Sequence, residues 1–202
     1  MDISSNSIEF IENKYNEEED ICNISFSLLS GLINVRNIEF KNCSFTDCDF
    51  SNSILNKVSF FNTLFTNCNF SSCNFDDSSF SKVKFDNCKI LGSSFINTNF
   101  LSSSFNNCLL DYSNFTYSSL KDCIFTNSSL KYTNFDNFKF NKLIFEDSLL
   151  TQASFFNSHL NNLDFSTCDI SGIILDKDML EGLKVNTSQA LEISKLLGII
   201  IK

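Results

Sequence analysis

The sequence predicts an all-β solenoid, a rod in which one chain winds into successive coils. From Phe40 to Leu180 every fifth residue is large and apolar: 29 consecutive positions hold 19 Phe, 8 Leu and 2 Ile, without an insertion or a slip. Two residues before each of them stands a second preferred residue, usually Cys, Ser, Thr or Val. Because neither an α-helix nor an ordinary β-strand has a five-residue period, this pattern indicates a repeat architecture.

Each five-residue repeat, or pentad, reads small–polar–large–polar–polar, as in residues 68–72. In an extended segment residues two apart point to the same side, so the small and the large residue both face inward. The last two residues must then turn the chain. The second of them is often a type that tolerates turns and positive φ, which predicts a corner at these positions: Asn42, Asp47, Asn52, Asn62, Asn67, Asp77, Asn87, Gly92 and Asn97.

Eight of the nine cysteines occupy the small inward position of a pentad. A free cysteine behaves as a small buried hydrophobe, so we interpret them as reduced core residues of a cytoplasmic protein. Their five-residue spacings, as between Cys43 and Cys48, follow the repeat rather than the spacing of metal ligands. The sequence therefore predicts neither a metal site nor a cofactor.

The net charge of −9 is concentrated at the two ends of the chain. Residues 1–20 carry seven acids and one base, residues 21–140 carry nine of each, and residues 141–202 carry eight acids and five bases. Without a basic stripe, direct binding of nucleic acid is not expected. The first fifteen residues do not resemble a signal peptide, and no apolar run is long enough for a membrane span.

The beginning of the chain does not follow the pentad frame. We expect residues 1–32 to form an irregular cap, in which Ile8 and Phe10 resemble the start of a strand. The acidic run at residues 17–20 is predicted to be a solvated loop. The solenoid is expected to occupy residues 33–185.

Residues 186–202 change period and predict a helix followed by a short strand. Thr187 or Ser188 can cap the helix at its start, and Gly198 stands where a helix commonly ends. Part of this apolar segment can cover the last coil. The apolar surface that remains suggests an end-to-end, two-fold homodimer. The residues predicted to take part in dimerisation are Ala190, Ile193, Leu196, Leu197, Gly198, Ile199, Ile200 and Ile201.

No catalytic residue is predicted. The neighbouring carboxylates at residues 76–77 and 146–147 could in principle form the acid pair of a glycosidase. However, adjacent residues on a coil face solvent without a cleft, so we interpret them as solvated turns. His159, the only histidine, lies between the two inward positions of its pentad and is expected to point outward.

The pentads resemble those of the pentapeptide-repeat family. The resemblance implies a right-handed quadrilateral β-helix with four pentads per coil, so that residues twenty apart stack. It thereby implies a stack of Tyr112 on Tyr132 and an exposed pair of Ile124 and Ile144. It also implies two inner columns, one of phenyl rings and one that begins with thiols: Phe65, Phe85, Phe105, Phe125 and Phe145, and Cys48, Cys68, Cys88 and Cys108.

Residues 180–202 (LEGLKVNTSQALEISKLLGIIIK) resemble the C-terminal ends of the Qnr quinolone-resistance proteins and of the microcin B17 self-protection protein. The shared elements are the last-coil L-x-G-L-K-V, the pair Gln189-Ala190, and Leu197-Gly198 followed by aliphatic residues. The resemblance implies a rod-shaped, DNA-mimicking dimer. It implies that the partner is DNA gyrase or topoisomerase IV, which the protein would protect from quinolones or a peptide toxin.

In such a dimer, acids near the C-terminal end of both subunits would form a negative, partner-binding saddle: Asp164, Asp169, Asp176, Asp178 and Glu181. Two features depart from the resemblance. The frame contains none of the coil-interrupting loops of the Qnr proteins from Gram-negative bacteria, and the middle of the rod is neutral. The alternative is a non-enzymatic scaffold or adaptor that binds another protein.

Overall fold

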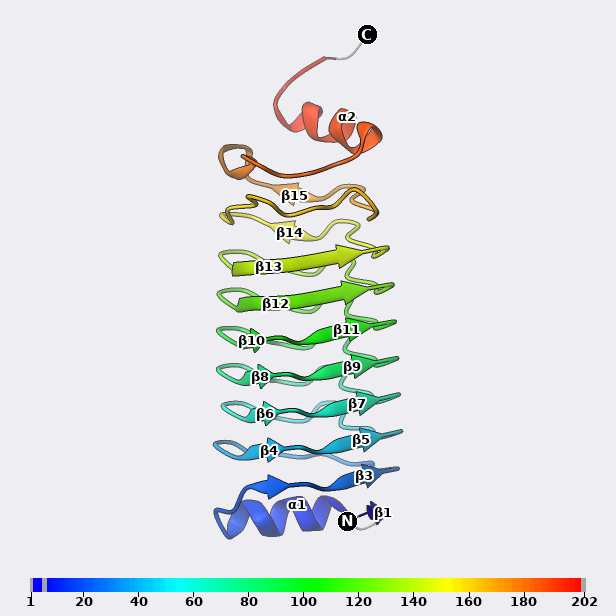
Figure 1. Cartoon of the computed structure of the whole chain (residues 1–202), viewed down its shortest axis with the longest axis vertical. Helices are drawn as coiled ribbons and strands as arrows, with labels where there is room; N and C mark the ends of the chain where they lie inside the picture. Colours follow the sequence, from blue (N-terminus) through cyan, green and yellow to red (C-terminus); the bar gives the residue numbers. More distant parts are fainter. Residues whose placement is uncertain (1, 5–6, 201–202) are drawn as a thin grey trace.

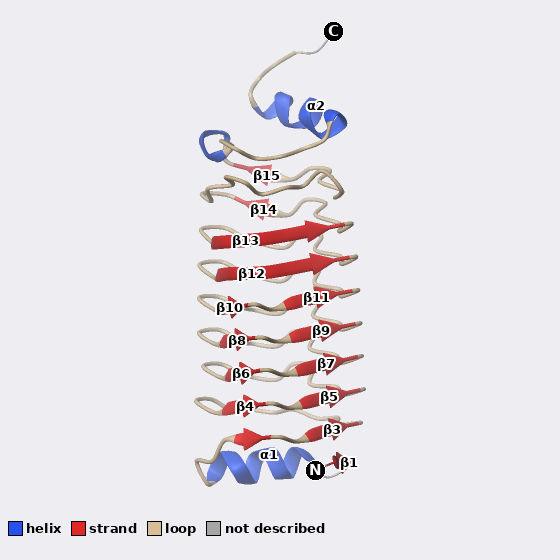
Figure 2. Cartoon of the chain, in the orientation of Figure 1, coloured by secondary structure: helices blue, strands red, loops and turns tan. Residues whose placement is uncertain are grey.

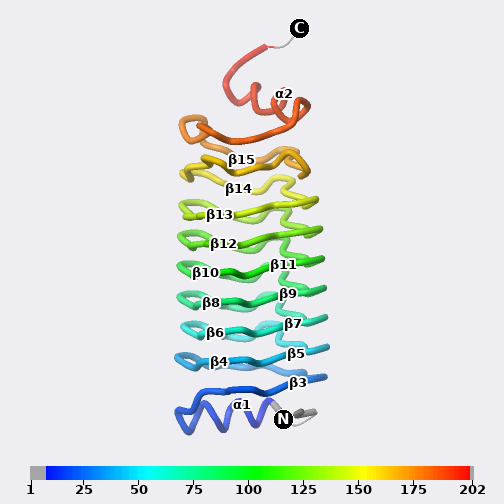
Figure 3. Tube along the Cα trace, viewed as in Figure 1, coloured from blue at the N-terminus to red at the C-terminus, as the bar shows by residue number. Residues whose placement is uncertain are grey.

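The computed structural model describes residues 2–4 and 7–200. The chain forms a parallel, right-handed quadrilateral β-solenoid of about 8 turns with one α-helix at each end (Figures 1 and 2). The winding is continuous along the rod, as the Cα trace shows (Figure 3). The solenoid predicted by the pentads and the quadrilateral β-helix implied by the family resemblance are therefore confirmed.

Two of the four faces carry regular parallel ladders. The first face contains β2 (Ile21–Cys22), β4 (Glu39–Lys41), β6 (Ser59–Phe61), β8 (Ser79–Ser81) and β10 (Asn99–Leu101). The second contains β1 (Asp2–Ser4), β3 (Ser25–Ser27), β5 (Ser44–Thr46), β7 (Leu64–Thr66), β9 (Lys84–Asp86) and β11 (Ser104–Asn106). Two longer strands, β12 (Ser119–Thr126) and β13 (Lys139–Glu146), run through both faces.

The other two faces are built mainly from single bridges. On the third face the bridges run from Ser30 to Asp169. On the fourth they run from Asn34 to Ser154, where β14 (Ser154–Phe155) pairs with β15 (Ile174–Leu175). Nearly every pairing on all four faces joins residues twenty apart, so one coil is twenty residues long.

The phenyl rings stack along the inside of the rod. On the second face the centroids of Phe85 and Phe105 are 4.7 Å apart, and those of Phe105 and Phe125 are 4.5 Å apart. Rings from neighbouring faces meet edge to face, which is a favourable arrangement for aromatic pairs. The small inward residues fill the space between the ring columns and the corners.

All nine cysteines are free; the eight in the small columns are buried, and Cys22, outside these columns, is exposed. Burial raises the pKa of Cys73 to about 12 and that of Cys123 to about 11. Such thiols stay protonated near neutral pH and react slowly, because the thiolate is the nucleophile. Their role in this chain is packing.

The corners have the predicted backbone. The second turn residue of almost every pentad has φ near +55°, for example Asn62 and Asp77. Many of these positions hold Asn, Asp or Gly, which adopt this conformation with little strain. Their side chains also link coils, since the Asn62 amide donates to the Asn42 carbonyl oxygen at 2.9 Å.

The N-terminal end differs from the prediction. Residues 7–16 form a helix, α1 (Ser7–Asn16), instead of an irregular segment, and the first coil begins at Ile21 rather than at residue 33. Ile11 is fully buried beneath this coil, and Phe10 lies 6.2 Å from Phe26. The helix forms because it covers core that the first coil leaves open. The acidic run follows it as a turn.

The first coil is one residue shorter than the others. Ser25 and Ser30 pair with residues nineteen further on, whereas Asn34 pairs with Ile54, twenty further on. The missing residue therefore lies between Ser30 and Asn34. Gly31 stands there with φ of +150°, and a Cβ on it would collide with the Ile8 side chain of α1. Only glycine combines this backbone with so close a helix.

At the C-terminal end a short 3-10 helix, η1 (Lys177–Met179), precedes α2 (Thr187–Leu196). The helix cap is Asn186 rather than Thr187 or Ser188: its side chain accepts a hydrogen bond from the Gln189 amide at 3.0 Å. Gly198, with φ of +74°, ends the helix as predicted, and the amides of Gly198 and Ile199 donate to Lys195 and Ser194.

The strand predicted after α2 is not formed by the single chain. Ile199 and Ile200 have no strand pairing, and Ile201 lies outside the described residues. The physical reason is that a strand needs a neighbouring edge to pair with, and α2 separates this segment from the last coil (Figure 1).

Candidate partner-binding surfaces

Gln189 closes the C-terminal end of the rod. Its side-chain amide donates two hydrogen bonds of 2.8 Å, to the carbonyl oxygens of Phe165 and Cys168 in the last full coil. Its own carbonyl accepts from the Asn186 amide at 2.8 Å, and the residue is buried. One side chain thus satisfies backbone groups of the coil and starts α2. The sequence marks Gln189 only as part of a motif, since a polar residue that replaces the next coil leaves no periodic signal.

The apolar residues of the C-terminal segment divide into two groups. Ile193, one turn after Gln189, is half-buried and packs against the core. The others on the predicted dimerisation list that the structure describes are exposed, with half of the Leu197 side chain and 85% of Ile200 accessible: Ala190, Leu196, Leu197, Gly198, Ile199 and Ile200. The last coil alone therefore does not cover this surface, which we call the apolar end.

The five acids predicted to form a saddle lie around the rod near the same end, but on different faces. Asp164 is on the second face, where it pairs in register with Lys184, and Asp169 is on the third. Asp176 caps η1, Asp178 lies within it, and Glu181 follows it. They form a ring rather than one patch. Their side chains do not converge on a single face of one subunit.

Two of these carboxylates are held in place locally. Hydrogen bonds from Ser166 lower the pKa of Asp164, and hydrogen bonds from Ser171 lower that of Asp169. The Ser171 amide lies 2.9 Å from the Asp169 carboxylate. Both groups therefore stay ionised at neutral pH, and their positions are fixed.

Acids in the middle of the rod join successive coils. Asp76, Asp111 and Asp136 each accept a hydrogen bond of 2.9 Å from a backbone amide twenty residues later. Each also accepts one from a serine hydroxyl of that coil. Asp77 accepts from the Asn97 side chain at 2.7 Å. These contacts assign the pair at residues 76–77 to the structure of the rod.

The stacked tyrosines predicted from the register are present. The rings of Tyr112 and Tyr132 are parallel, with centroids 4.8 Å apart, and both are exposed. Ile124 pairs with Ile144, as expected, although Ile124 is half-buried and only Ile144 is exposed. The two tyrosines are twenty residues apart, so the coil register places one directly above the other on the outer surface.

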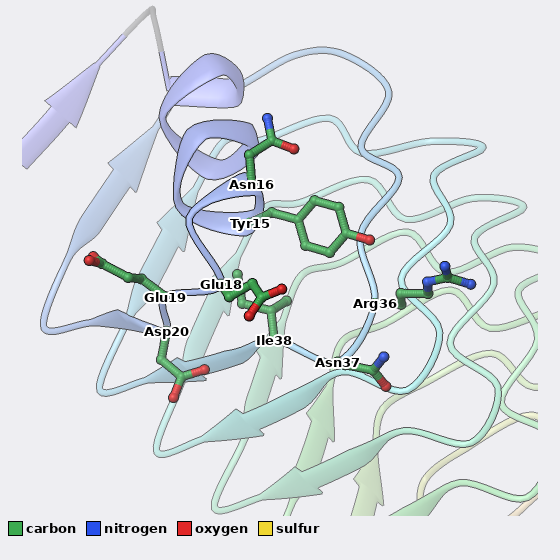
Figure 4. Close-up of a pocket in the computed structure, with 8 residues that line it drawn as sticks. All are labelled: Tyr15, Asn16, Glu18, Glu19, Asp20, Arg36, Asn37 and Ile38. Atoms are coloured by element: carbon green, nitrogen blue, oxygen red, sulfur yellow. The ribbon is translucent and has the colours of Figure 1, made fainter.

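A hollow of about 510 Å³ lies beside α1 at the N-terminal end (Figure 4). Tyr15 and Glu18 line it from the cap, and Arg36, the only arginine of the chain, faces them from the first coil (Figure 4). The nearby acids already have partners: Glu19 binds Lys14 of the cap, and Asp20 accepts a hydrogen bond from the backbone amide of Glu39 in β4. The hollow is the junction between the cap and the coil.

Among residues 2–4 and 7–200, no cluster of His, Cys, Asp or Glu side chains is arranged to hold a metal ion. Within the same part of the chain, neither helix has the length and apolar character needed to cross a bilayer.

The coils, corners and inner columns define a solenoid built from five-residue repeats. A family model of the pentapeptide repeat region matches residues 38–115, and a model of eight copies of the pentapeptide repeat matches residues 103–142. The chain belongs to the pentapeptide-repeat family. No curated protein matches the chain.

Several solved structures are similar to this chain. A trypsin-treated variant of QnrB1, a plasmid-mediated fluoroquinolone resistance protein, is 20% identical, with 87% of this chain and 99% of that chain covered and a TM-score of 0.44. HetL, involved in heterocyst differentiation regulation in the cyanobacterium Nostoc sp. strain PCC 7120, is 12% identical, with coverages of 91% and 94% and a TM-score of 0.42. A pentapeptide repeat protein from the Arabidopsis thaliana thylakoid lumen is also 12% identical, with coverages of 64% and 73% and a TM-score of 0.35.

Proposed function

We propose that this protein is a DNA-mimicking binder of a type II topoisomerase, DNA gyrase or topoisomerase IV, that protects the enzyme from a quinolone or a peptide toxin. The observation that carries the proposal is the C-terminal end. Its sequence resembles that of the Qnr and microcin B17 self-protection proteins, and Gln189 anchors it to a coil. It leaves Leu197 and Ile200 exposed.

The apolar end supports the proposed end-to-end homodimer. Exposed aliphatic side chains that are contiguous and cap a polar rod favour burial against a second copy. In such a dimer the acid rings of two subunits come together around the middle of a doubled rod. Ionised carboxylates such as Asp164 and Asp169 then give this region the negative potential that a DNA-binding surface attracts.

Replacement of Leu197 by Asp is expected to convert the dimer into monomers, because a carboxylate would be buried at the contact without a partner. The measurement is the molar mass by light scattering at several protein concentrations. Leu109→Asp is the matched control, since Leu109 is similarly exposed but lies on the side of the rod. A Leu197→Asp protein that is still dimeric would show that the end-to-end arrangement is wrong.

The functional test is DNA supercoiling by gyrase in the presence of ciprofloxacin, with the protein titrated from nanomolar to micromolar concentration. Rescue of supercoiling is expected, and rescue by the Leu109→Asp control but not by Leu197→Asp would link protection to the dimer. Inhibition without rescue would indicate a DNA-competitive binder directed against another poison. If gyrase and topoisomerase IV were both unaffected, the proposal would be refuted.

A scaffold or adaptor is the alternative, and one observation favours it. The middle of the rod has equal numbers of acids and bases, and Asp76, Asp111 and Asp136 join coils rather than forming a free negative row. On this alternative the protein acts through the shape of its side faces. Either function is carried out by binding, without a catalytic step.

A further inference from the structure

The winding continues past Phe138 and Phe140 on the first face, but the regular packing of the rod is disturbed there. The small inward column of this face contains Val58, Ser78, Thr98 and Ser118, and Phe138 stands next in it. Phe138 is buried there, and Phe140 is only half-buried. Among the large pentad positions from Phe40 to Ile170, Phe140 is the one exception to full burial. Two phenyl rings cannot both occupy space made for one ring and a small residue.

The backbone around this pair is affected as well. The ladder of the first face ends with the pairing of residues 119–121 with residues 139–141, and no backbone hydrogen bond in the described chain joins residues 139–141 to residues 159–161. On the second face the ring spacing grows from 5.1 Å between Phe125 and Phe145 to 5.8 Å between Phe145 and Phe165. The coils therefore separate above Phe138 on this side of the rod.

Ser118 gives independent evidence of the disturbance. The equivalent Ser78 and Thr98 hydroxyls each donate to a carbonyl of the preceding coil. The Ser118 hydroxyl is the one buried side-chain polar atom without a hydrogen-bond partner among the described residues. Ser118 comes directly before Phe138 in this column, and its hydroxyl lacks the hydrogen bond that the Ser78 and Thr98 hydroxyls make to the preceding coil. The first face thus lacks one hydroxyl hydrogen bond beside Phe138 and loses its ladder beyond this ring.

The result is a surface hollow of about 570 Å³, here called the seam hollow. Phe140, Tyr117 and His159 supply its aromatic wall, and Lys139, Asn157 and Asn161 supply its polar rim. None of the described residues that line it is Asp or Glu. The protein has a net charge of −9, yet this hollow carries a cationic side chain and amide donors beside its aromatic wall.

We propose that the seam hollow binds an aromatic side chain flanked by carboxylates on a partner protein. A ring can pack against Phe140 and Tyr117 in the edge-to-face manner used within the core. Lys139 and the asparagine side chains can donate hydrogen bonds to the flanking carboxylates, and no lining acid repels them. The volume suits one ring with its neighbouring groups. This inference does not depend on the topoisomerase proposal.

The experiment follows His159 by NMR, because the only histidine of the chain lies in the hollow and its ring signals report directly on occupancy. The probe is the blocked tripeptide acetyl-Glu-Phe-Glu-amide, added to tens of millimolar. Saturable shifts of the His159 signals are expected. The Gln-Phe-Gln and Glu-Ala-Glu analogues are expected to bind about threefold to tenfold more weakly, since each lacks one element of recognition.

Two variants test whether the disturbed packing at Phe138 creates the seam hollow and whether Lys139 contributes to binding. Phe138→Ser restores the small residue of the column, so Phe140 can turn inward and close the hollow. The fold is expected to be retained, and the shifts of the His159 signals are expected to disappear. Lys139→Gln is expected to weaken Glu-Phe-Glu binding about threefold, and Lys121→Gln, one coil earlier on the same face, leaves it unchanged. Absence of shifts in the unmodified protein, equal binding of the Gln-Phe-Gln peptide, or undiminished binding to Phe138→Ser would each overturn the proposal.

Discussion

Replacement of Phe105 by Ala is expected to lower the free energy of unfolding by about 3–5 kcal/mol. Phe105 is completely buried and stacks between Phe85 and Phe125, with ring planes within 3° of parallel. The strands on both sides are fixed by ladder hydrogen bonds, so the coil cannot collapse into the space that the ring leaves. The cavity and the lost ring contacts therefore both count against the folded state.

The measurement is urea unfolding followed by circular dichroism, at a fixed protein concentration because dimerisation would add to the apparent stability. Phe156→Ala is the matched control: that ring is more than half exposed, and its removal is expected to cost less than 1 kcal/mol. A gentler slope of the Phe105→Ala transition would show the rod unfolding in parts, as solenoids can. Equal losses for the two variants would contradict a core stabilised by ring stacking.

Replacement of Gln189 by Leu is the second large expected effect. Leu has a similar size but no amide, so the carbonyl oxygens of Phe165 and Cys168 would be left buried without donors. Each such group costs about 1–3 kcal/mol, which gives a total of about 2–6 kcal/mol, with the capping box of α2 lost as well. The helix is expected to detach from the last coil before the rod unfolds.

Hydrogen exchange resolved by residue would detect this, as faster exchange of the α2 amides while those of β5 to β11 keep their protection. Gln152→Leu is the control, since the other glutamine of the chain is exposed at a corner and makes no comparable contact. Loss of the proposed dimer in Gln189→Leu would show that α2 must be anchored to present the apolar end. If α2 exchange did not change, the two amide hydrogen bonds would not be what holds the helix.

The regular part of the fold could be predicted from the sequence because each pentad repeats the same pattern of inward-facing and turn residues. Inward pairs such as Cys68 and Phe70 set the faces, and turn residues such as Asn62 set the corners. The ends lacked such redundancy. Helix α1 forms through Ile11 and Phe10 packing on the first coil, and that contact leaves no five-residue signal.

The surfaces were harder to predict than the core. The positions of Asp164 and Asp169 on different faces follow from the register, whereas the predicted saddle grouped them by their nearness in the chain. The seam hollow was missed because Phe140 satisfies the large-residue rule. The signal was Phe138, a large residue where the column requires a small one.

Because one coil contains twenty residues, the number of residues between two positions determines the angle between them about the rod axis. An insertion of one pentad rotates everything beyond it by a quarter turn about the rod, whereas a whole extra coil only lengthens the rod, by about 4.8 Å. From the seam hollow at Phe140 to the last regular coil the frame has no insertion, so the azimuth between the hollow and the apolar end is fixed. In the proposed end-to-end dimer, that azimuth would also determine the directions in which the seam hollows of the two subunits face.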